Sequence, residues 1–114
     1  RYRPQKHDLV FVASGDRRKP LASAALGQDW VWRAPAVLVI TGVYDRTMGK
    51  YGQRGRRYVH MEVGHAAQNV YLQATAMGLG TVMVGAFDDK EVQDVLGLPA
   101  DHKPLGLMPI GHRR

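Results

Sequence analysis

Two pairs of side chains in the sequence are of types that could do proton or metal chemistry. Lys50 and Tyr51 are adjacent, and each can take up or release a proton, so the pair could act as a general base. Glu62 and His65 have the i, i+3 spacing of carboxylate-bridged metal sites, but those sites need a second such motif and further carboxylates. We therefore expect no metal site, and a buried Glu62–His65 pair joined by a hydrogen bond.

Glycines and serines in the sequence narrow the chemistry further. Gly78, Gly80 and Gly85 are similar to a dinucleotide-binding fingerprint in composition. That fingerprint follows a strand and opens a helix, whereas here a helix comes first, so a Rossmann site is excluded. The glycines either end the helix or let the backbone approach a flat ligand, and both interpretations stay open. Ser14 and Ser23, the two serines, do not lie in a nucleophile elbow, so hydrolase chemistry is not indicated.

Composition limits the classes of protein that remain. At 114 residues and 45% hydrophobic content, the chain is expected to fold as one domain. It has no cysteine, which excludes disulfides and thiolate metal sites and suits the cytoplasm, where we expect the protein. The longest apolar run, Ala36–Val43, is too short to span a bilayer, so we expect no membrane partner. The net charge of +6 fits either an anionic ligand, nucleic acid included, or ordinary surface charge.

A long helix is the element around which the other elements must be placed. Apolar residues recur at steps of three and four between Tyr58 and Met77, which predicts a helix over that range. Its C-terminal half is apolar almost all round, so we expect this helix to be buried on more than one side. One small sheet cannot cover so many faces, and we therefore predict a homodimer with the helix at or near the interface.

Shorter elements are predicted on both sides of this helix. We expect strands over Asp8–Ala13, Ala36–Val43, Thr81–Val84 and Leu105–Ile110, helices over Leu21–Leu26 and from the Asp88 cap to Leu96, and an exposed loop over Asp45–Arg57. The β-branched run of Ala36–Val43 predicts a strand with both faces covered, and Pro109 predicts an edge position for the last strand. The fold class is α+β, a small sheet with helices packed around a long central helix.

An ordered series of short motifs runs through the whole chain. It comprises Tyr2-Arg3-Pro4 with His7 and Leu9, Leu21–Gln28, Trp30-Val31, Ala34-Pro35, Lys50-Tyr51-Gly52 with Arg54-Gly55, Arg57-Tyr58, Glu62, Gly64–Asn69, Gly78-Leu79-Gly80, Gly85–Asp89 and Pro109-Ile110-Gly111. In this order the motifs resemble the nitroreductase-like flavoproteins, specifically their SagB-type dehydrogenase branch. The resemblance implies a nitroreductase-like α+β fold, a homodimer with flavin at the subunit interface, and an FMN-dependent oxidoreductase that transfers two electrons. The implied electron donor is NADH or NADPH, and the substrate is a small molecule or a peptide.

Functional residues also follow from the resemblance. It places Met83, Val84, Gly85, Ala86 and Phe87 against the isoalloxazine ring with a backbone N–H near N5, Gln68 and Asn69 near the flavin, and Arg113 and Arg114 at its phosphate. In azoline-oxidising members, a Lys-Tyr pair that matches Lys50-Tyr51 assists proton removal, and here the pair would lie in a mobile loop that acts as a lid. Family members normally begin with a further phosphate-gripping segment, so residues 1–114 are expected to be a nitroreductase-like domain that lacks it.

Two alternatives stay open on the sequence alone. The first is a flavin-less remnant of this fold that acts as a dimeric binding module. The second is a basic nucleic-acid-binding domain, which rests on the net charge and on the cluster Arg54–Arg57. Flavin colour in the purified protein and salt dependence of nucleic-acid binding would separate these possibilities.

Overall fold

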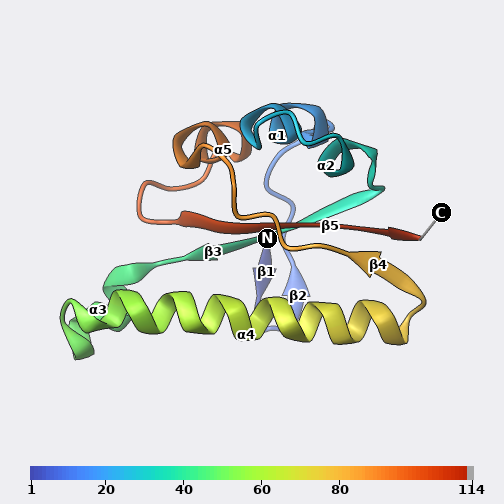
Figure 1. The fold of residues 1–114 in the computed structure, drawn as a ribbon. Helices are drawn as coiled ribbons and strands as arrows, with labels where there is room; N and C mark the ends of the chain where they lie inside the picture. Colours follow the sequence, from blue (N-terminus) through green and yellow to red (C-terminus); the bar gives the residue numbers. More distant parts are fainter. Residues whose placement is uncertain (113–114) are drawn as a thin grey trace.

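A three-stranded sheet lies between two layers of helix in the computed structural model, which describes residues 1–112 (Figure 1). In chain order the elements are β1 (Tyr2–Arg3), β2 (Asp8–Leu9), α1 (Arg18–Ala24), α2 (Asp29–Arg33), β3 (Ala36–Gly42), α3 (Tyr44–Tyr51), α4 (Arg54–Ala76), β4 (Leu79–Thr81), α5 (Asp89–Leu96) and β5 (Lys103–His112). Helices α1, α2 and α5 lie on one face of the sheet, and α4 runs along the other. The predicted α+β class, with a small sheet and a long helix, is confirmed.

The central strand of the sheet is β5, in the order β3-β5-β4, and both pairings are antiparallel. The predicted edge position was therefore wrong, although Pro109 does interrupt the ladder. Leu107 N–H donates to Val84 O on the β4 side, and the nitrogen two residues later points the same way. At Pro109 that nitrogen has no hydrogen. Pairing with β4 is interrupted at this position, between the Thr81 pair and the Val84 bridge. A proline is tolerated in the central strand because it lies at this gap.

Strand β3 confirms the predicted strand over Ala36–Val43 but not its coverage. Val37 and Val39 pack against the core beneath α1, α2 and α5, whereas Leu38, on the opposite face, is 39% exposed. Helix α4 passes close to β3 at Gly42, where an added Cβ would lie 2.8 Å from the Val59 side chain. The helix therefore covers the C-terminal end of β3 and leaves the other end open.

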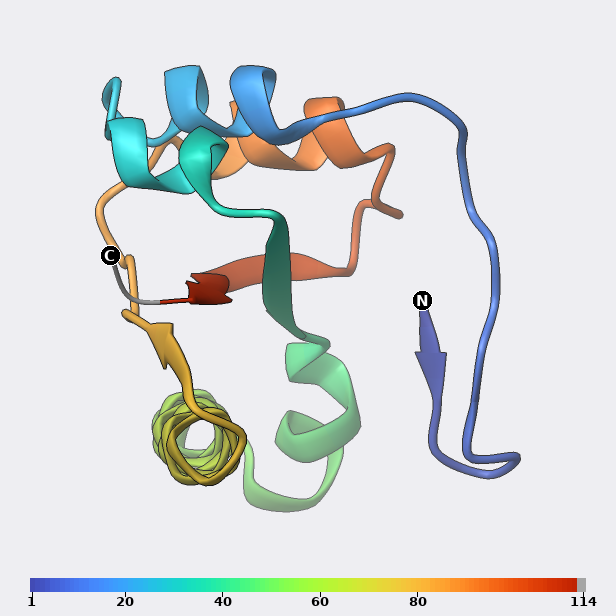
Figure 2. The ribbon, with the colours of Figure 1, turned by 90° about the vertical axis from the view of Figure 1, so that its right-hand side faces the viewer.

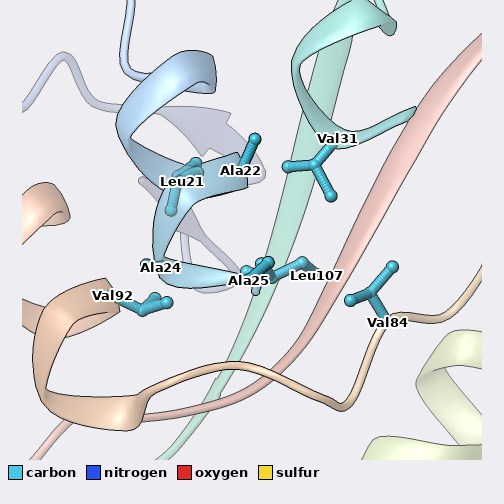
Figure 3. Close-up of a cluster of buried hydrophobic side chains, with 8 residues drawn as sticks. All are labelled: Leu21, Ala22, Ala24, Ala25, Val31, Val84, Val92 and Leu107. Atoms are coloured by element: carbon cyan, nitrogen blue, oxygen red, sulfur yellow. The ribbon is translucent and has the colours of Figure 1, made fainter. Parts of the chain in front are cut away.

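Small and branched side chains form the core between the sheet and the α1, α2, α5 layer (Figure 3). Its buried members are Leu21, Ala22, Ala24, Ala25, Val31, Val84, Val92 and Leu107. Two helices of this layer were predicted, although α1 begins at Arg18 and ends at Ala24, whereas the short helix α2 (Asp29–Arg33) was missed. The Asp88 cap is confirmed, because Glu91 N–H donates to the Asp88 carboxylate at 2.8 Å and Gly97 ends α5 with a φ of +61°.

Helix α4 is longer than predicted and is buried along a single stripe within residues 1–112. It begins at Arg54 rather than Tyr58, and its buried residues are Gly55, Val59, Val63, Ala67 and Ala74. Large apolar side chains elsewhere on the helix are uncovered, with Met61 53% and Leu72 61% exposed. The described chain therefore leaves open the further helix faces that were expected to be buried.

The predicted loop over Asp45–Arg57 was wrong, because α3 and the first turn of α4 occupy this range. The two helices pack together at Gly55, where an added Cβ would lie 2.9 Å from the Met48 backbone. At the same corner the Arg56 guanidinium lies 4.3 Å from the centre of the Tyr44 ring, a cation–π contact. In a segment predicted as a loop, Gly55 thus permits close packing of two helices.

At the N-terminus a short hairpin replaces the predicted strand over Asp8–Ala13. Strand β2 pairs with β1, and an ion pair between Arg3 Nη2 and Asp8 Oδ2 at 2.5 Å ties the two strands together. Beyond Val10 the segment has no strand partner within residues 1–112, and Phe11 is 80% exposed. The prediction was wrong for this part because an apolar run forms a strand only where another strand is available to pair with it.

Candidate functional site

We call the segment from Met83 to Phe87, which joins the sheet to α5, the 83–87 turn. Its first residues are fixed on α4 and β5. Met83 N–H donates to the Tyr71 hydroxyl of α4 at 2.6 Å, and Val84 exchanges two backbone hydrogen bonds with Leu107 at 2.8 and 3.0 Å. The turn therefore leaves the sheet in a defined direction.

The other end of the turn is fixed on the helical layer. Ala86 O accepts a hydrogen bond from Gln28 Nε2 at 2.9 Å, and Asp88 N–H donates to Ala24 O at 2.8 Å. Gln28 lies between α1 and α2, so contacts from four different parts of the fold hold a segment of five residues. The turn is fixed in place even though Gly85 and Ala86 are exposed.

Three consecutive N–H groups in the turn, those of Gly85, Ala86 and Phe87, donate no hydrogen bond within residues 1–112. A trans peptide group points its C=O and its N–H in opposite directions. Because Val84 O accepts from Leu107 on β5, the Gly85 N–H is directed away from β5. Unpaired donors on a fixed turn, two of them at the exposed residues Gly85 and Ala86, suit a ligand with hydrogen-bond acceptors.

Nothing in the described chain requires a glycine at position 85. Its φ is not positive, and an added Cβ would meet no atom within 4 Å. A glycine that neither the backbone conformation nor the surrounding packing demands leaves room for something outside the chain to approach the backbone. This feature agrees with the close-approach interpretation of the glycines and separates Gly85 from Gly78, whose φ of +71° serves the end of α4.

Gln68 and Asn69 are exposed on α4 and point in different directions. Gln68 lies three residues before Tyr71, so the two side chains share one face of the helix. Tyr71 in turn holds Met83, which puts Gln68 on the face of α4 next to the 83–87 turn. Asn69 is about 100° further round the helix and faces away from Gln68.

Lys50 and Tyr51 lie at the C-terminal end of α3 and are both exposed. The Lys50 Nζ is 5.2 Å from the centre of the Tyr51 ring, and that ring packs edge-on against Tyr58 at 5.0 Å. Tyr51 and Tyr58 line a cleft of about 1070 Å³ between the N-terminal hairpin and the α3–α4 corner, with Arg46 also in its wall. The pair is thus placed on a helix, and the expectation of a mobile lid loop was wrong.

Within one chain, the Lys50–Tyr51 pair lies far from the 83–87 turn. Tyr51 contacts Tyr58 and Met83 is bonded to Tyr71, and along α4 these two tyrosines are about 20 Å apart at roughly 1.5 Å of rise per residue. Figure 2 shows α3 and the N-terminal hairpin on one side of the molecule and β4 on the other. The residues predicted for one site therefore form two separate groups in a single chain.

The sequence profile of the nitroreductase family matches residues 1–112. The chain belongs to this family. It is 50% identical over 113 residues to a candidate nitroreductase of Methanocaldococcus jannaschii, a match that covers 99% of this chain and 56% of the relative. It is 32% identical over 112 residues to the NADPH-flavin oxidoreductase of Vibrio harveyi, covering 91% of this chain and 47% of the relative. It is 27% identical over 124 residues to the FMN reductase [NAD(P)H] of Bacillus subtilis, a match that covers 95% of this chain and 49% of the relative.

Solved structures agree with the family assignment. The NADPH:FMN oxidoreductase of Vibrio harveyi, solved with NAD+, superposes with a TM-score of 0.73 at 30% identity, over 89% of this chain and 47% of that one. A candidate nitroreductase of Anabaena variabilis superposes with a TM-score of 0.78 at 35% identity, over 85% of this chain and 20% of that one. This member of the nitroreductase family therefore has the family's fold, and it spans about half the length of the relatives that it matches.

The metal-site residues considered in the sequence can also be checked in this nitroreductase family member. Glu62 and His65 are not a buried pair, because their side chains are 79% and 69% exposed and Glu62 Oε1 lies 3.8 Å from His65 Nδ1. Within residues 1–112 there is no group of three metal-ligating side chains, and no helix in that range is long and apolar enough to cross a membrane. Arg113 and Arg114 lie outside the described residues.

Sequence reasoning missed two residues that fix the 83–87 turn, Gln28 and Tyr71. Gln28 belongs to a quoted motif, but its bond to Ala86 joins residues 58 positions apart. Tyr71 was not singled out within the predicted helix, although its hydroxyl accepts a hydrogen bond from Met83 N–H. A tyrosine in an otherwise apolar helix is a usable signal, because a partly buried phenol hydroxyl normally finds a hydrogen-bond partner.

Proposed function

We propose that this chain is the flavin-binding part of an FMN-dependent oxidoreductase, with the 83–87 turn against the flavin. The observation that supports this proposal most is the exposed, unpaired Gly85 N–H on a turn that is fixed at both ends. When bound, FMN supplies two-electron redox chemistry, with NADH or NADPH as the electron donor. The names of two relatives, an FMN reductase and an NADPH-flavin oxidoreductase, agree with this cofactor.

The residues present fit such a group in the following way. Flavin is flat and has acceptor atoms along its edge, and the open space at Gly85 together with the three unpaired N–H groups would receive that edge. Gln68 and Asn69 offer side-chain amides on α4 for further hydrogen bonds. Arg113 and Arg114 would provide charge-assisted contacts to the phosphate.

We further propose that the site is completed by a second copy of the chain. A site with both groups of residues needs two chains, because one chain separates the groups by about 20 Å along α4. The outward face of α4 supports a homodimer, since Met61 and Leu72 are exposed there. Gly64 shares this face, and an added Cβ would meet nothing within 4 Å. A glycine within a helix costs about 1 kcal/mol relative to alanine. The presence of Gly64 despite this cost is explained if the backbone of a partner subunit approaches at this position.

Lys50 and Tyr51 are the proposed proton-accepting residues and favour the SagB-type dehydrogenase branch. Both side chains are exposed, and the tyrosine borders a cleft large enough for part of a peptide. In this proposal the pair would accept one proton from an azoline-type small molecule or peptide. FMN held by the partner subunit would supply the acceptor for the hydride, which carries the two electrons and the second hydrogen. A cytoplasmic location fits a chain without cysteine.

A spectrum of the purified protein tests the proposed function. We expect a yellow protein whose flavin, released by heating, is identified by chromatography as FMN and whose absorbance bleaches on addition of NADH or NADPH. A colourless protein that takes up no added FMN would overturn the proposal. If that protein were dimeric, the binding-module alternative would replace it. Binding to nucleic acid whose logarithmic affinity falls with the logarithm of salt concentration would favour the nucleic-acid alternative.

A further inference from the structure

Gln28 makes two hydrogen bonds that join the helical layer to the 83–87 turn. Its Nε2 donates to Ala25 O at 2.8 Å and to Ala86 O at 2.9 Å. The residues just before it have an unusual backbone, because Leu26 has a φ of +58° and Gly27 a φ of +73°. A positive φ at leucine is strained. The fold accepts this strain in the connection that brings Gln28 to the turn.

The bond from Gln28 fixes the orientation of a peptide group in the turn. Because Ala86 C=O points toward Gln28, the N–H of the same trans peptide, that of Phe87, points the opposite way. The Gly85 N–H is directed in the same manner by the bond between Leu107 and Val84 O. Two of the three unpaired donors are therefore each aimed by a hydrogen bond to the preceding carbonyl, one from β5 and one from Gln28.

We infer that Gln28 is a positioning residue, whose side-chain amide sets the direction of the Phe87 N–H donor and thereby the ligand-binding form of the 83–87 turn. The identity of the ligand, FMN, rests on the proposed function. The positioning role of Gln28 rests on its own hydrogen bonds and does not depend on which ligand binds. Within residues 1–112 the side-chain amide of Gln28 donates to two backbone carbonyls, so it acts through the turn and not on a substrate.

Two substitutions separate the role of the donor from the role of the side chain's volume. Gln28→Glu keeps the size of the side chain but replaces the donor by a carboxylate, which accepts only and is repelled by both carbonyl oxygens. Gln28→Leu removes the donor without adding charge. Gln93→Glu is the matched control, because Gln93 Nε2 also donates to a backbone carbonyl, that of His102 at 3.0 Å, beyond the far end of α5.

Amide resonances of the flavin-free protein test the inference without any ligand. In both Gln28 variants we expect the ¹H–¹⁵N signals of Gly85, Ala86 and Phe87 to shift and their order parameters to fall. Signals of the β5 core should stay in place, and Gln93→Glu should leave the turn unchanged. Wild-type signals for these three amides in Gln28→Glu and Gln28→Leu would overturn the inference.

Titration with FMN then tests whether the fixed turn matters for binding. We expect the Kd for FMN to rise at least tenfold in both Gln28 variants and the absorbance spectrum of the bound flavin to change, with wild-type values in Gln93→Glu. A Kd within twofold of wild type despite a disordered turn would overturn the ligand-binding part of the inference. If the wild-type protein binds no FMN, the proposed function fails, and the amide signals alone decide whether Gln28 positions the turn.

Discussion

An added Cβ at Gly85 would meet no atom of the described chain within 4 Å, and the backbone there does not have a positive φ. The residue can therefore be changed with little effect on the fold, which is uncommon for a glycine beside a core. Its neighbours Val84 and Leu107 are almost fully buried, so the open position lies directly next to a rigid part of the molecule. Such a position separates effects on ligand binding from effects on folding.

Gly85→Val should abolish FMN binding while the protein stays folded. The branched side chain would occupy the space through which a flat ligand reaches the Gly85 N–H, and its Cβ would meet no atom of the described chain within 4 Å. We expect the melting temperature to change by no more than about 2 °C, since surface substitutions are usually within about 0.5 kcal/mol. Flavin content and circular dichroism measure the two effects. Full FMN occupancy in this variant would remove the turn from the site.

Lys50→Ala and Tyr51→Phe should reduce turnover but not FMN binding. Tyr51→Phe keeps the ring that packs against Tyr58 at 5.0 Å and removes the hydroxyl alone. For an azoline-containing peptide, we expect turnover to fall about a hundredfold or more, the scale of a lost general base. The bound flavin should remain reducible by a chemical reductant. Unchanged turnover in both variants, with Tyr58→Phe as control, would favour a plain nitro- or quinone-reducing role.

At the scale of elements, the α3–α4 corner depends on how closely two helices approach. A Cβ added at Gly55 would lie 2.9 Å from the Met48 backbone, which cannot move aside as a flexible side chain can. Gly49, in α3 itself, has nothing within 4 Å of the same test atom. The two glycines therefore differ in role although the sequence context of both is basic and polar.

Gly55→Ala should destabilise the protein, and Gly49→Ala should stabilise it. Overpacking at Gly55 is expected to cost about 1–3 kcal/mol, whereas alanine at an open helical position adds about 0.5–1 kcal/mol. Urea denaturation followed by circular dichroism gives both free energies of unfolding. Equal effects of the two substitutions would mean that the helices do not meet at Gly55.

These glycines also indicate how far the sequence could predict the fold. The Asp88 cap, the strand over Ala36–Val43 and the long helix were predicted because capping and periodicity are local signals. The α3 helix was missed because the sequence does not distinguish a glycine that permits helix packing, such as Gly55, from a glycine in a flexible loop. The edge position predicted from Pro109 was wrong for a related reason. A proline is tolerated in β5 because pairing with the neighbouring strand is interrupted at that position, which the sequence does not show.

The candidate site was predictable only in part. The 83–87 turn was named from a resemblance, and the Lys50–Tyr51 pair from its residue types and the same resemblance. The chain places the pair and the middle of the turn, Gly85 and Ala86, at its surface. Their separation could not be predicted, because it depends on which side of α4 each neighbouring element packs. The bond from Gln28 to Ala86 was also beyond prediction, since no local pattern relates residues 58 positions apart.

At the scale of the whole molecule, the outward face of α4 decides whether the protein is a dimer. Leu72 is 61% exposed on this face, and Leu72→Glu would place a charge in an apolar interface. We expect the wild type to sediment as a dimer at micromolar concentration and Leu72→Glu as a folded monomer. Gln73→Glu, the same charge on the next exposed residue, points about 100° away and should remain dimeric. A monomeric wild type would contradict the proposed homodimer.

A site formed by residues from both subunits predicts a result that a site within one chain does not. Lys50→Ala removes the proposed proton acceptor and Gly85→Val removes the flavin contact, so dimers of either variant should be inactive. A heterodimer of the two variants has one site with an intact 83–87 turn from the first chain and an intact Lys50–Tyr51 pair from the second. Two copies with different affinity tags allow that heterodimer to be purified, and its turnover of an azoline-containing peptide should return to about half that of the wild-type dimer, since one of two symmetric sites is complete. If each chain formed its own site, both sites of the heterodimer would stay defective and no activity would return.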